Sequence, residues 1–184
     1  MTATRRAIHR CALVALVVLV GCGGGEKPSA PLPGAGAKLD LRSPAFPDGA
    51  TIPRRFTCDG AGASPPLSWS GVPGGARSLA LVVEDQDAGR FVHWTVLDIP
   101  ASVHALAEGR VPDGATQTDN SFGKLGWGGP CPPKGDAPHY YVFALYATRA
   151  PLALGRGASP DDVRAALAKV AIARGVLTGL YARG

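Results

Sequence analysis

Short apolar runs separated by turn residues recur along the chain from about residue 38 to its end. Residues 79–83 form a continuous apolar run, which predicts a buried strand. In residues 91–99 and 139–147, successive side chains suit opposite environments, and this period of two predicts strands with two different faces. His139 and Tyr141 would then lie on one face of the last of these strands. The pattern predicts a mainly β domain.

Weaker signals fill the rest of the domain. Residues 39–45 and 52–57 have the composition of short extended pieces, and residues 101–129 form a long, weakly patterned segment. Near the end of the chain, Ser159 is a suitable helix N-cap and Pro160 a suitable first helical residue. The stripe of apolar side chains that follows has helical spacing and consists of Val163, Ala166, Leu167 and Val170. We expect this helix to be the last element, a C-terminal helix.

Composition narrows the class further. The chain has 184 residues, of which 46% are hydrophobic, so it is long enough for one domain with a core and too apolar to be disordered. Its 25 glycines and 17 prolines are scattered between the apolar runs, which favours a turn-rich β domain over a helical bundle.

The formal net charge of +5 does not indicate a nucleic-acid partner. Arg5, Arg6 and Arg10 lie in a segment that we expect to be removed, and without them 16 basic residues face 14 acidic ones. No dense cluster of Lys and Arg with interleaved aromatic residues is present in the sequence, so we predict that the protein binds no nucleic acid.

The N-terminus has the pattern of a lipoprotein signal peptide over residues 1–21. A basic start precedes an apolar stretch at residues 11–20, which is too short to cross a bilayer, since crossing takes about 20 residues. The sequence Leu-Val-Gly-Cys at 19–22 resembles a bacterial lipobox, which implies lipidation of Cys22. An ordinary signal peptide and an uncleaved anchor are the alternatives.

The Gly-, Ala- and Pro-rich residues 22–37 predict a flexible tether, and the domain is expected at 38–184. The predicted location is the bacterial cell envelope, with the protein held at the membrane by its N-terminal lipid. Gly23 is not the Asp that retains some lipoproteins in the inner membrane, and this favours the periplasmic side of the outer membrane.

A cluster of acidic side chains follows the buried run at 79–83, and His93 comes a short loop later. If the two predicted strands are neighbours, Asp85, Asp87 and His93 line one pocket. Each of two residues also has a purely structural interpretation: His93 as a core histidine hydrogen-bonded to a carbonyl, and Asp87 as a side chain that braces its loop. We expect the pocket to bind a small anionic or phosphorylated group.

Several blocks in order resemble the phosphatidylethanolamine-binding protein family, in particular its bacterial Raf-kinase-inhibitor-like branch. They are DQDAG with FVHW, GGPCPPKG with HYYVFALYA, and also CDGAGASPPLSW, NSFGKLGWGG and the final LYAR. The resemblance covers residues 39–184. It implies a mainly β fold of two antiparallel sheets in Greek-key connection, with small flanking helices.

The resemblance also implies an anion pocket. Carried over by position, its residues are Asp85, Asp87, His93, Gly129, Pro130, His139 and Tyr141. Gln86 and Gly89 stand where the family usually has prolines, so the loop that carries both carboxylates is expected to be looser. In such a pocket the imidazoles and the phenol would donate to the anion, while Asp85 would orient an imidazole.

Two functions other than anion binding are compatible with this sequence. A protein-interaction or inhibitor module that engages an envelope partner is the first alternative. A hydrolase that uses Asp85 and His93 with Ser64 or Ser121 is the second, although neither serine lies in a nucleophile elbow. Metal binding is also conceivable, since the possible ligands are Asp85, Asp87, His93 and His139. Their spacing matches no tight metal motif, so we predict no metal site. We also predict no cofactor and no catalysis.

Cys58 and Cys131 remain once Cys11 is removed with the signal and Cys22 is acylated. Two thiols in an exported domain predict a disulfide, which would stabilise the fold by roughly 4 kcal/mol through the loop it closes. The alternative is two reduced thiols, one of them at the rim of the pocket.

Overall fold

The structure is a computed structural model that describes residues 30–184. The predicted signal peptide, Cys22 and the first part of the predicted tether therefore lie outside the described residues. Among the residues that it describes, no helix is long and apolar enough to cross a membrane.

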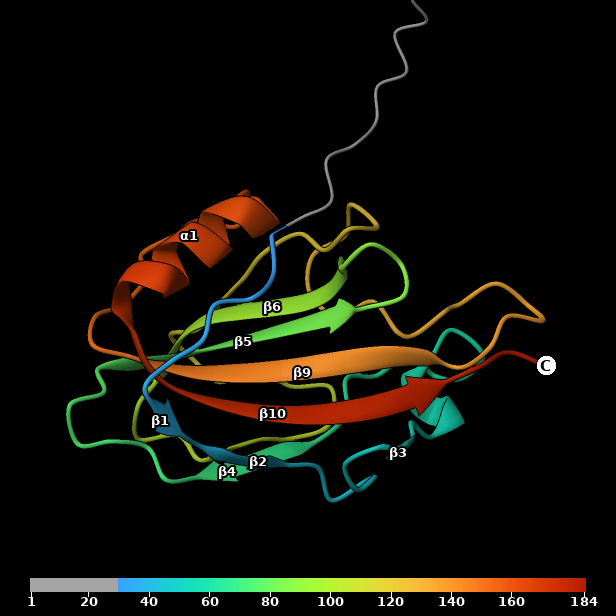
Figure 1. Cartoon of the computed structure of the whole chain (residues 1–184), viewed down its shortest axis with the longest axis horizontal. Helices are drawn as coiled ribbons and strands as arrows, with labels where there is room; N and C mark the ends of the chain where they lie inside the picture. The colour runs from blue at the N-terminus through green and yellow to red at the C-terminus, as the bar shows by residue number, and fades with distance from the viewer. Residues whose placement is uncertain (1–29) are drawn as a thin grey trace, which may run out of the picture.

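Two β-sheets form the domain (Figure 1). The large sheet has seven strands. Six of them follow the order β1 (Ala37–Lys38), β10 (Ala171–Tyr181), β9 (His139–Thr148), β5 (Ser78–Asp85), β6 (Phe91–Pro100) and β8 (Thr116–Gln117), and β3 (Ala50–Thr51) also pairs with β10. The small sheet consists of β2 (Asp40–Arg42), β4 (Leu67–Ser70) and β7 (Ala105–Leu106). A 3-10 helix, η1 (Arg54–Phe56), and one α-helix, α1 (Pro160–Val170), complete the described elements.

The hydrophobic core fills the space between the sheets, because the inward residues of both sheets are large and apolar. Trp94, Phe143 and Leu81 of the large sheet pack there with Leu41 and Trp69 of the small sheet. A second cluster lies on the other face of the large sheet, where α1 covers it, as Figure 1 shows. Every residue of β5 is buried, as expected for a strand covered on both faces.

The three strongest strand predictions are confirmed as β5, β6 and β9, and β5 pairs in antiparallel fashion with β6 on one side and β9 on the other. The predicted N-cap is also confirmed. The Ser159 hydroxyl accepts from the Asp162 backbone N–H at 3.2 Å, and the Asp162 carboxylate accepts from the Ser159 N–H at 3.0 Å. This reciprocal capping box starts α1 at Pro160.

Three details of the prediction are wrong. The helix is not the last element, because β10 follows it directly. The large sheet is not purely antiparallel, since β1 and β3 both run parallel to β10. Residues 52–57, expected to be extended, contain the 3-10 turn η1. The Greek-key connection stays an expectation from the resemblance.

Glycines weakened the sequence signal of β10, although the fold requires them there. A Cβ at Gly175 would lie 2.9 Å from Leu39, and a Cβ at Gly179 would lie 2.4 Å from Ile52. The strand can accept these close neighbours only without a side chain at those positions.

Residues 30–37, which the sequence assigned to the tether, contact the domain. Leu32 packs against the cluster beneath α1. The Tyr146 hydroxyl donates to the Pro33 carbonyl at 2.8 Å, and β1 begins at Ala37.

Candidate functional site

The predicted site residues with titratable side chains meet at one end of the large sheet. Asp85 ends β5 and is paired with Phe91 of β6 on one side and Tyr141 of β9 on the other. His93 and His139 come from these two flanking strands. The pairing of β5 with both neighbours therefore brings both imidazoles to the same strand end.

Asp85 is the central acceptor of the site. Its side chain is only 4% exposed. One carboxylate oxygen accepts from the backbone N–H groups of Asp87 (2.9 Å) and Ala88 (3.2 Å), and the other lies 2.8 Å from His139 Nδ1. The carboxylate thus closes the loop after β5 and orients His139, which is the role expected for it.

His139 is held in a state that favours a positive charge. Burial lowers its pKa, but the hydrogen bond to Asp85 and the negative charges of Asp85, Asp87 and Asp136 raise it more, so the net pKa is above the ordinary value. Its Nδ1–H donates to Asp85, while Nε2 lies 3.7 Å from an Asp136 oxygen, beyond hydrogen-bond range. The protonated ring therefore has an Nε2–H to offer.

Asp87 acts as a brace between the loop and β9. One of its oxygens accepts from the Tyr140 backbone N–H at 2.7 Å, and its residue is exposed to solvent. This contact agrees with the purely structural interpretation of Asp87 as a loop brace. Its second oxygen still adds negative charge at the rim.

His93 is the neutral counterpart of His139. Its Nδ1 lies 2.7 Å from the Gly128 carbonyl oxygen, and because a carbonyl only accepts, Nδ1 carries the proton. Burial lowers its pKa, and the Gly128 carbonyl and Asp85 offset this only in part. In the neutral ring, Nε2 is then an acceptor. The hydrogen bond of Nδ1 to Gly128 agrees with the purely structural interpretation of His93, while Nε2 remains for a ligand.

Aromatic rings surround His93. Its ring centroid lies 5.3 Å from that of Phe91, 5.4 Å from that of Phe122 and 5.1 Å from that of Tyr141. Phe122 and Tyr141 both meet the imidazole edge-on. These rings fix the orientation of the imidazole and keep water from most of it.

The Tyr141 hydroxyl is a buried polar group without a partner. Tyr141 is fully buried, and by distance and angle its oxygen makes no hydrogen bond with the described residues, although the Asp85 side chain and the Cys131 backbone lie near enough to affect it. Burial and the nearby carboxylate of Asp85 raise its pKa, so the phenol stays protonated. Its ring lies beside both imidazoles, with its centroid 5.1 Å from that of His93 and 6.5 Å from that of His139. An unpaired buried hydroxyl costs free energy, so this group marks a place for a ligand atom or an ordered water.

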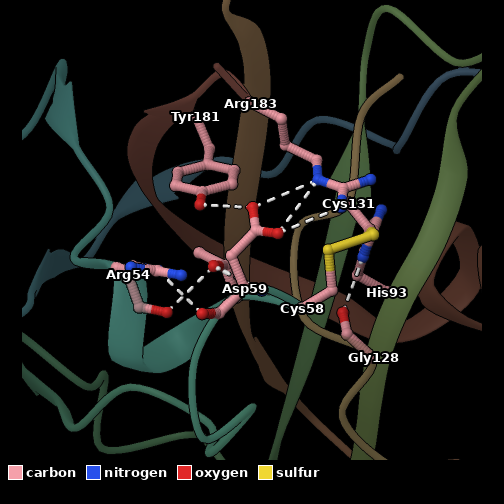
Figure 2. Close-up of a disulfide and its surroundings, with 9 residues drawn as sticks. Arg54, Cys58, Asp59, His93, Gly128, Cys131, Tyr181 and Arg183 are labelled. Atoms are coloured by element: carbon pink, nitrogen blue, oxygen red, sulfur yellow. Dashed lines mark hydrogen bonds and ion pairs between the residues drawn. A yellow bond between two sulfur atoms is a disulfide. The ribbon is translucent and has the colours of Figure 1, made fainter. Parts of the chain in front are cut away.

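Gly129 and Pro130 directly follow Gly128, the partner of His93, and pack against the turn after η1. A Cβ on Gly129 would come within 2.9 Å of the Phe56 carbonyl oxygen, so only glycine fits there. The Pro130 carbonyl accepts from the Cys58 N–H at 3.1 Å. The disulfide between Cys58 and Cys131 is present as predicted, with the two Cα atoms 5.4 Å apart (Figure 2).

Sequence reasoning missed the residues that fix His93 from outside the three strands. Gly128 binds it through the backbone, and Phe122, which is 46% exposed, packs on it. Buried Asn120 shapes the turn of Phe122: its side-chain oxygen accepts from the N–H groups of Phe122 and Lys124 at 2.9 and 3.2 Å. The glycine-rich NSFGKLGWGG block was the only available signal, and it does not say which backbone group faces the histidine.

The two serines of the hydrolase alternative lie in different surroundings, and neither is joined to an imidazole. The Ser121 hydroxyl accepts from the Val92 backbone N–H at 2.9 Å. Ser64 lines a separate cavity of about 280 Å³ beside Trp94 and Trp127. Neither serine is hydrogen-bonded to His93 or His139, whose Nδ1 partners are Gly128 and Asp85.

A metal site does not fit the hydrogen bonds of the cluster. Ligand atoms of Asp85, Asp87 and His139 lie within 4.8 Å of one another. Asp85, however, already accepts three hydrogen bonds, one of them from His139 Nδ1 and two from backbone N–H groups of its own loop. A cation would have to break the contacts that hold the loop.

A cavity of about 600 Å³ lies elsewhere, between residues 38–48 and the β10 residues Val176 and Leu177. None of the predicted site residues lines it. Of its charged lining residues, Arg42 is already paired with Asp40 at 2.7 Å, and Asp48 accepts from the Thr178 backbone N–H at 2.8 Å. Size alone therefore does not make it the functional site, and the strand-end cluster has the reactive side chains.

The domain is thus a β-sandwich with two imidazoles, two carboxylates and a buried phenol at one strand end. The family model "Phosphatidylethanolamine-binding protein" matches residues 42–182, and the chain belongs to this family. YbcL from Escherichia coli, described as a member of the mammalian family, has a similar structure with a TM-score of 0.76. It is 35% identical over 80% of this chain and 100% of its own.

Two relatives extend the comparison. A UPF0098 protein from Methanothermobacter thermautotrophicus is 47% identical over 79% of this chain and all of its own length. A Mycobacterium tuberculosis protein named "Putative lipoprotein LppC" is 40% identical over 98% of this chain and 99% of its own. The second alignment includes the N-terminal region in which we predicted the lipobox.

Proposed function

We propose that this protein binds a phosphate-like anion or a phosphorylated head group at the strand-end site, while an N-terminal lipid on Cys22 holds it at the cell envelope. The observation that carries the proposal is the Tyr141 hydroxyl, which is buried without a hydrogen-bond partner of good geometry beside two imidazoles. A ligand oxygen is the group that would satisfy it.

The electrostatics of the site suit an anion despite its two carboxylates. Asp85 is neutralised by its contacts with His139 and two backbone N–H groups. His139 with its raised pKa supplies a cationic donor, and Tyr141 supplies a neutral one. Neutral His93 supplies an acceptor at Nε2, which matches the O–H of a partly protonated phosphate.

The location rests on three supports. The likeness to a protein named as a lipoprotein spans nearly the whole chain. The lipobox-like sequence precedes Cys22, and the Cys58–Cys131 disulfide is typical of proteins outside the reducing cytoplasm. We favour the periplasmic side of the outer membrane.

Calorimetry with inorganic phosphate and with phosphoethanolamine tests the proposal. Tyr141→Phe removes the unpaired hydroxyl and should weaken binding about tenfold, the value of one hydrogen bond to a charged group. Tyr146→Phe is the matched control, because its hydroxyl bonds Pro33 on the other face of the sheet. Absence of saturable binding to the wild type, or equal binding by both variants, would refute the proposal.

A second candidate is interaction with an envelope protein. Phe122 and Leu125 are 46% and 45% exposed on one turn, and Phe122 packs directly on His93. Such a rim could present a bound anion together with apolar surface. Capture of an envelope protein that is lost in Phe122→Ser and competed by phosphate would support this candidate over simple ligand binding.

A further inference from the structure

Residues 127–131, here called the strap, connect His93 with the turn that follows η1. Toward β6, the Gly128 N–H donates to the His93 carbonyl at 2.8 Å and the Gly128 carbonyl accepts from His93 Nδ1 at 2.7 Å. The strap thus holds both the backbone and the ring of His93. Displacement of the strap would remove the carbonyl acceptor that keeps the His93 proton on Nδ1.

On its other side, the strap is fastened to residues 56–58. Trp127 Nε1 donates to the Phe56 carbonyl at 3.2 Å, and Gly129 packs so closely on this turn that no Cβ fits. Cys58 donates its N–H to Pro130 and forms the disulfide with Cys131. The disulfide is the one covalent fastening among these contacts.

The turn is itself anchored, so the disulfide ties the strap to a fixed point (Figure 2). The Asp59 carboxylate accepts from the Arg183 guanidinium at 3.0–3.1 Å and from the Tyr181 hydroxyl at 2.8 Å. Arg54 Nε donates to the Asp59 carbonyl at 2.7 Å. The last strand and its C-terminal extension therefore hold one end of the disulfide in place.

In the sequence, Cys131 lies between the residue that binds His93 and His139 itself. Gly128, the partner of His93, precedes Cys131 in the strap, and the loop after Cys131 leads into His139 at the start of β9. Cys58 is exposed and Cys131 is partly buried, so a thiol reagent can reach the bond from solvent. A bond that holds the site is thus open to reduction.

We infer that the Cys58–Cys131 disulfide is a positioning element that sets the tautomer of His93 through the strap, and that its redox state controls the affinity of the site. This inference rests on the proposed anion binding. A dithiol reductant would supply two electrons and two protons, break the S–S bond, leave two cysteine thiols and become a disulfide itself. The strap would then keep only its hydrogen bonds and the packing of Gly129 as fastenings to the turn.

The test compares the folded protein before and after reduction with dithiothreitol, using nitrogen NMR of the imidazoles and phosphate titration. In the oxidised protein, the His93 signals should be those of the neutral Nδ1–H tautomer. Reduction should mix the tautomers and weaken phosphate binding about two- to tenfold, because the site must then be ordered on binding. Gly129→Ala, which displaces the strap with the disulfide intact, should reproduce the change in the His93 signals.

Val163→Ala is the control for general loss of stability, since Val163 packs beneath α1 on the far face of the large sheet. It should leave the His93 signals and the affinity unchanged. Unchanged His93 signals and affinity after complete reduction, verified by thiol counting, would overturn the inference. Phosphate binding absent from both redox forms would instead refute the proposed function, and the His93 signals would still decide whether the disulfide positions the ring.

Discussion

Anion binding at this site should be linked to proton uptake at His93. In the unliganded protein the only proton of His93 is on Nδ1 and is donated to Gly128 at 2.7 Å. Its lowered pKa keeps the ring neutral at neutral pH, so Nε2 presents a lone pair to the ligand. Sulfate has no proton to donate near neutral pH. It must therefore bind to a His93 that has gained a second proton.

The size of the effect follows from the number of linked protons. One linked proton changes the association constant about tenfold per pH unit, which corresponds to about 1.4 kcal/mol. Sulfate affinity should therefore fall about tenfold per unit as the pH rises from about 6.5 to 8, above the lowered pKa of His93 in the free protein. The raised pKa of His139 acts in the same direction once the pH exceeds it, since loss of that proton removes the cationic donor.

Calorimetry in buffers with different ionisation enthalpies measures the proton uptake directly. The slope of the observed heat against buffer enthalpy should indicate about one proton per sulfate at neutral pH in the wild type. His93→Asn offers an amide donor that does not titrate, so the slope should fall by about one proton. A wild-type slope of zero, together with an affinity that does not change between about pH 6 and 8, would refute this view of the site.

Three further predictions concern stability. Arg164 of α1 and Glu84 of β5 form a buried ion pair. Arg164→Ala leaves the Glu84 carboxylate buried without this partner, so the substitution should lower the free energy of unfolding by about 3–5 kcal/mol, measured by urea denaturation. His139→Asn removes a group whose pKa rises on folding, so its cost should be full below about pH 6.5 and should shrink as the pH rises through the folded-state pKa. A constant cost from pH 5 to 9 would contradict that sign. Asn120→Ala leaves the 120–126 turn without its buried brace, and amide hydrogen exchange should show faster opening there than in β9.

Sequence patterns predicted the parts of this fold that depend on local chemistry. The apolar run of β5 and the alternation of β6 and β9 reflect burial on each face, and the Ser159–Asp162 capping box needs only neighbouring residues. The end of the chain was mispredicted, because the glycines that allow close approach of Leu39 and Ile52 also dilute the strand signal of β10.

The site shows the same limit. The strand-end pattern grouped Asp85, Asp87 and His93, and alternation placed His139 and Tyr141 on one face. The resemblance joined these two groups and added Gly129 and Pro130. No local pattern could show that Gly128 accepts from His93 or that Phe122 covers its ring, since both contacts depend on how the long segment before residue 129 folds back onto β6. The roles of Asp85 and Gly129 likewise became clear only from their partners in space.

The central claim is that an oxygen of a ligand anion accepts a hydrogen bond from the Tyr141 hydroxyl, beside the two imidazoles. The most direct measurement is the electron density at this strand end in a crystal grown with phosphoethanolamine. We predict a phosphate group with its oxygens within hydrogen-bond distance of Tyr141 Oη and of Nε2 of His93 and His139. Density for a single water on Tyr141, with the phosphate absent at saturating concentration, would contradict the account.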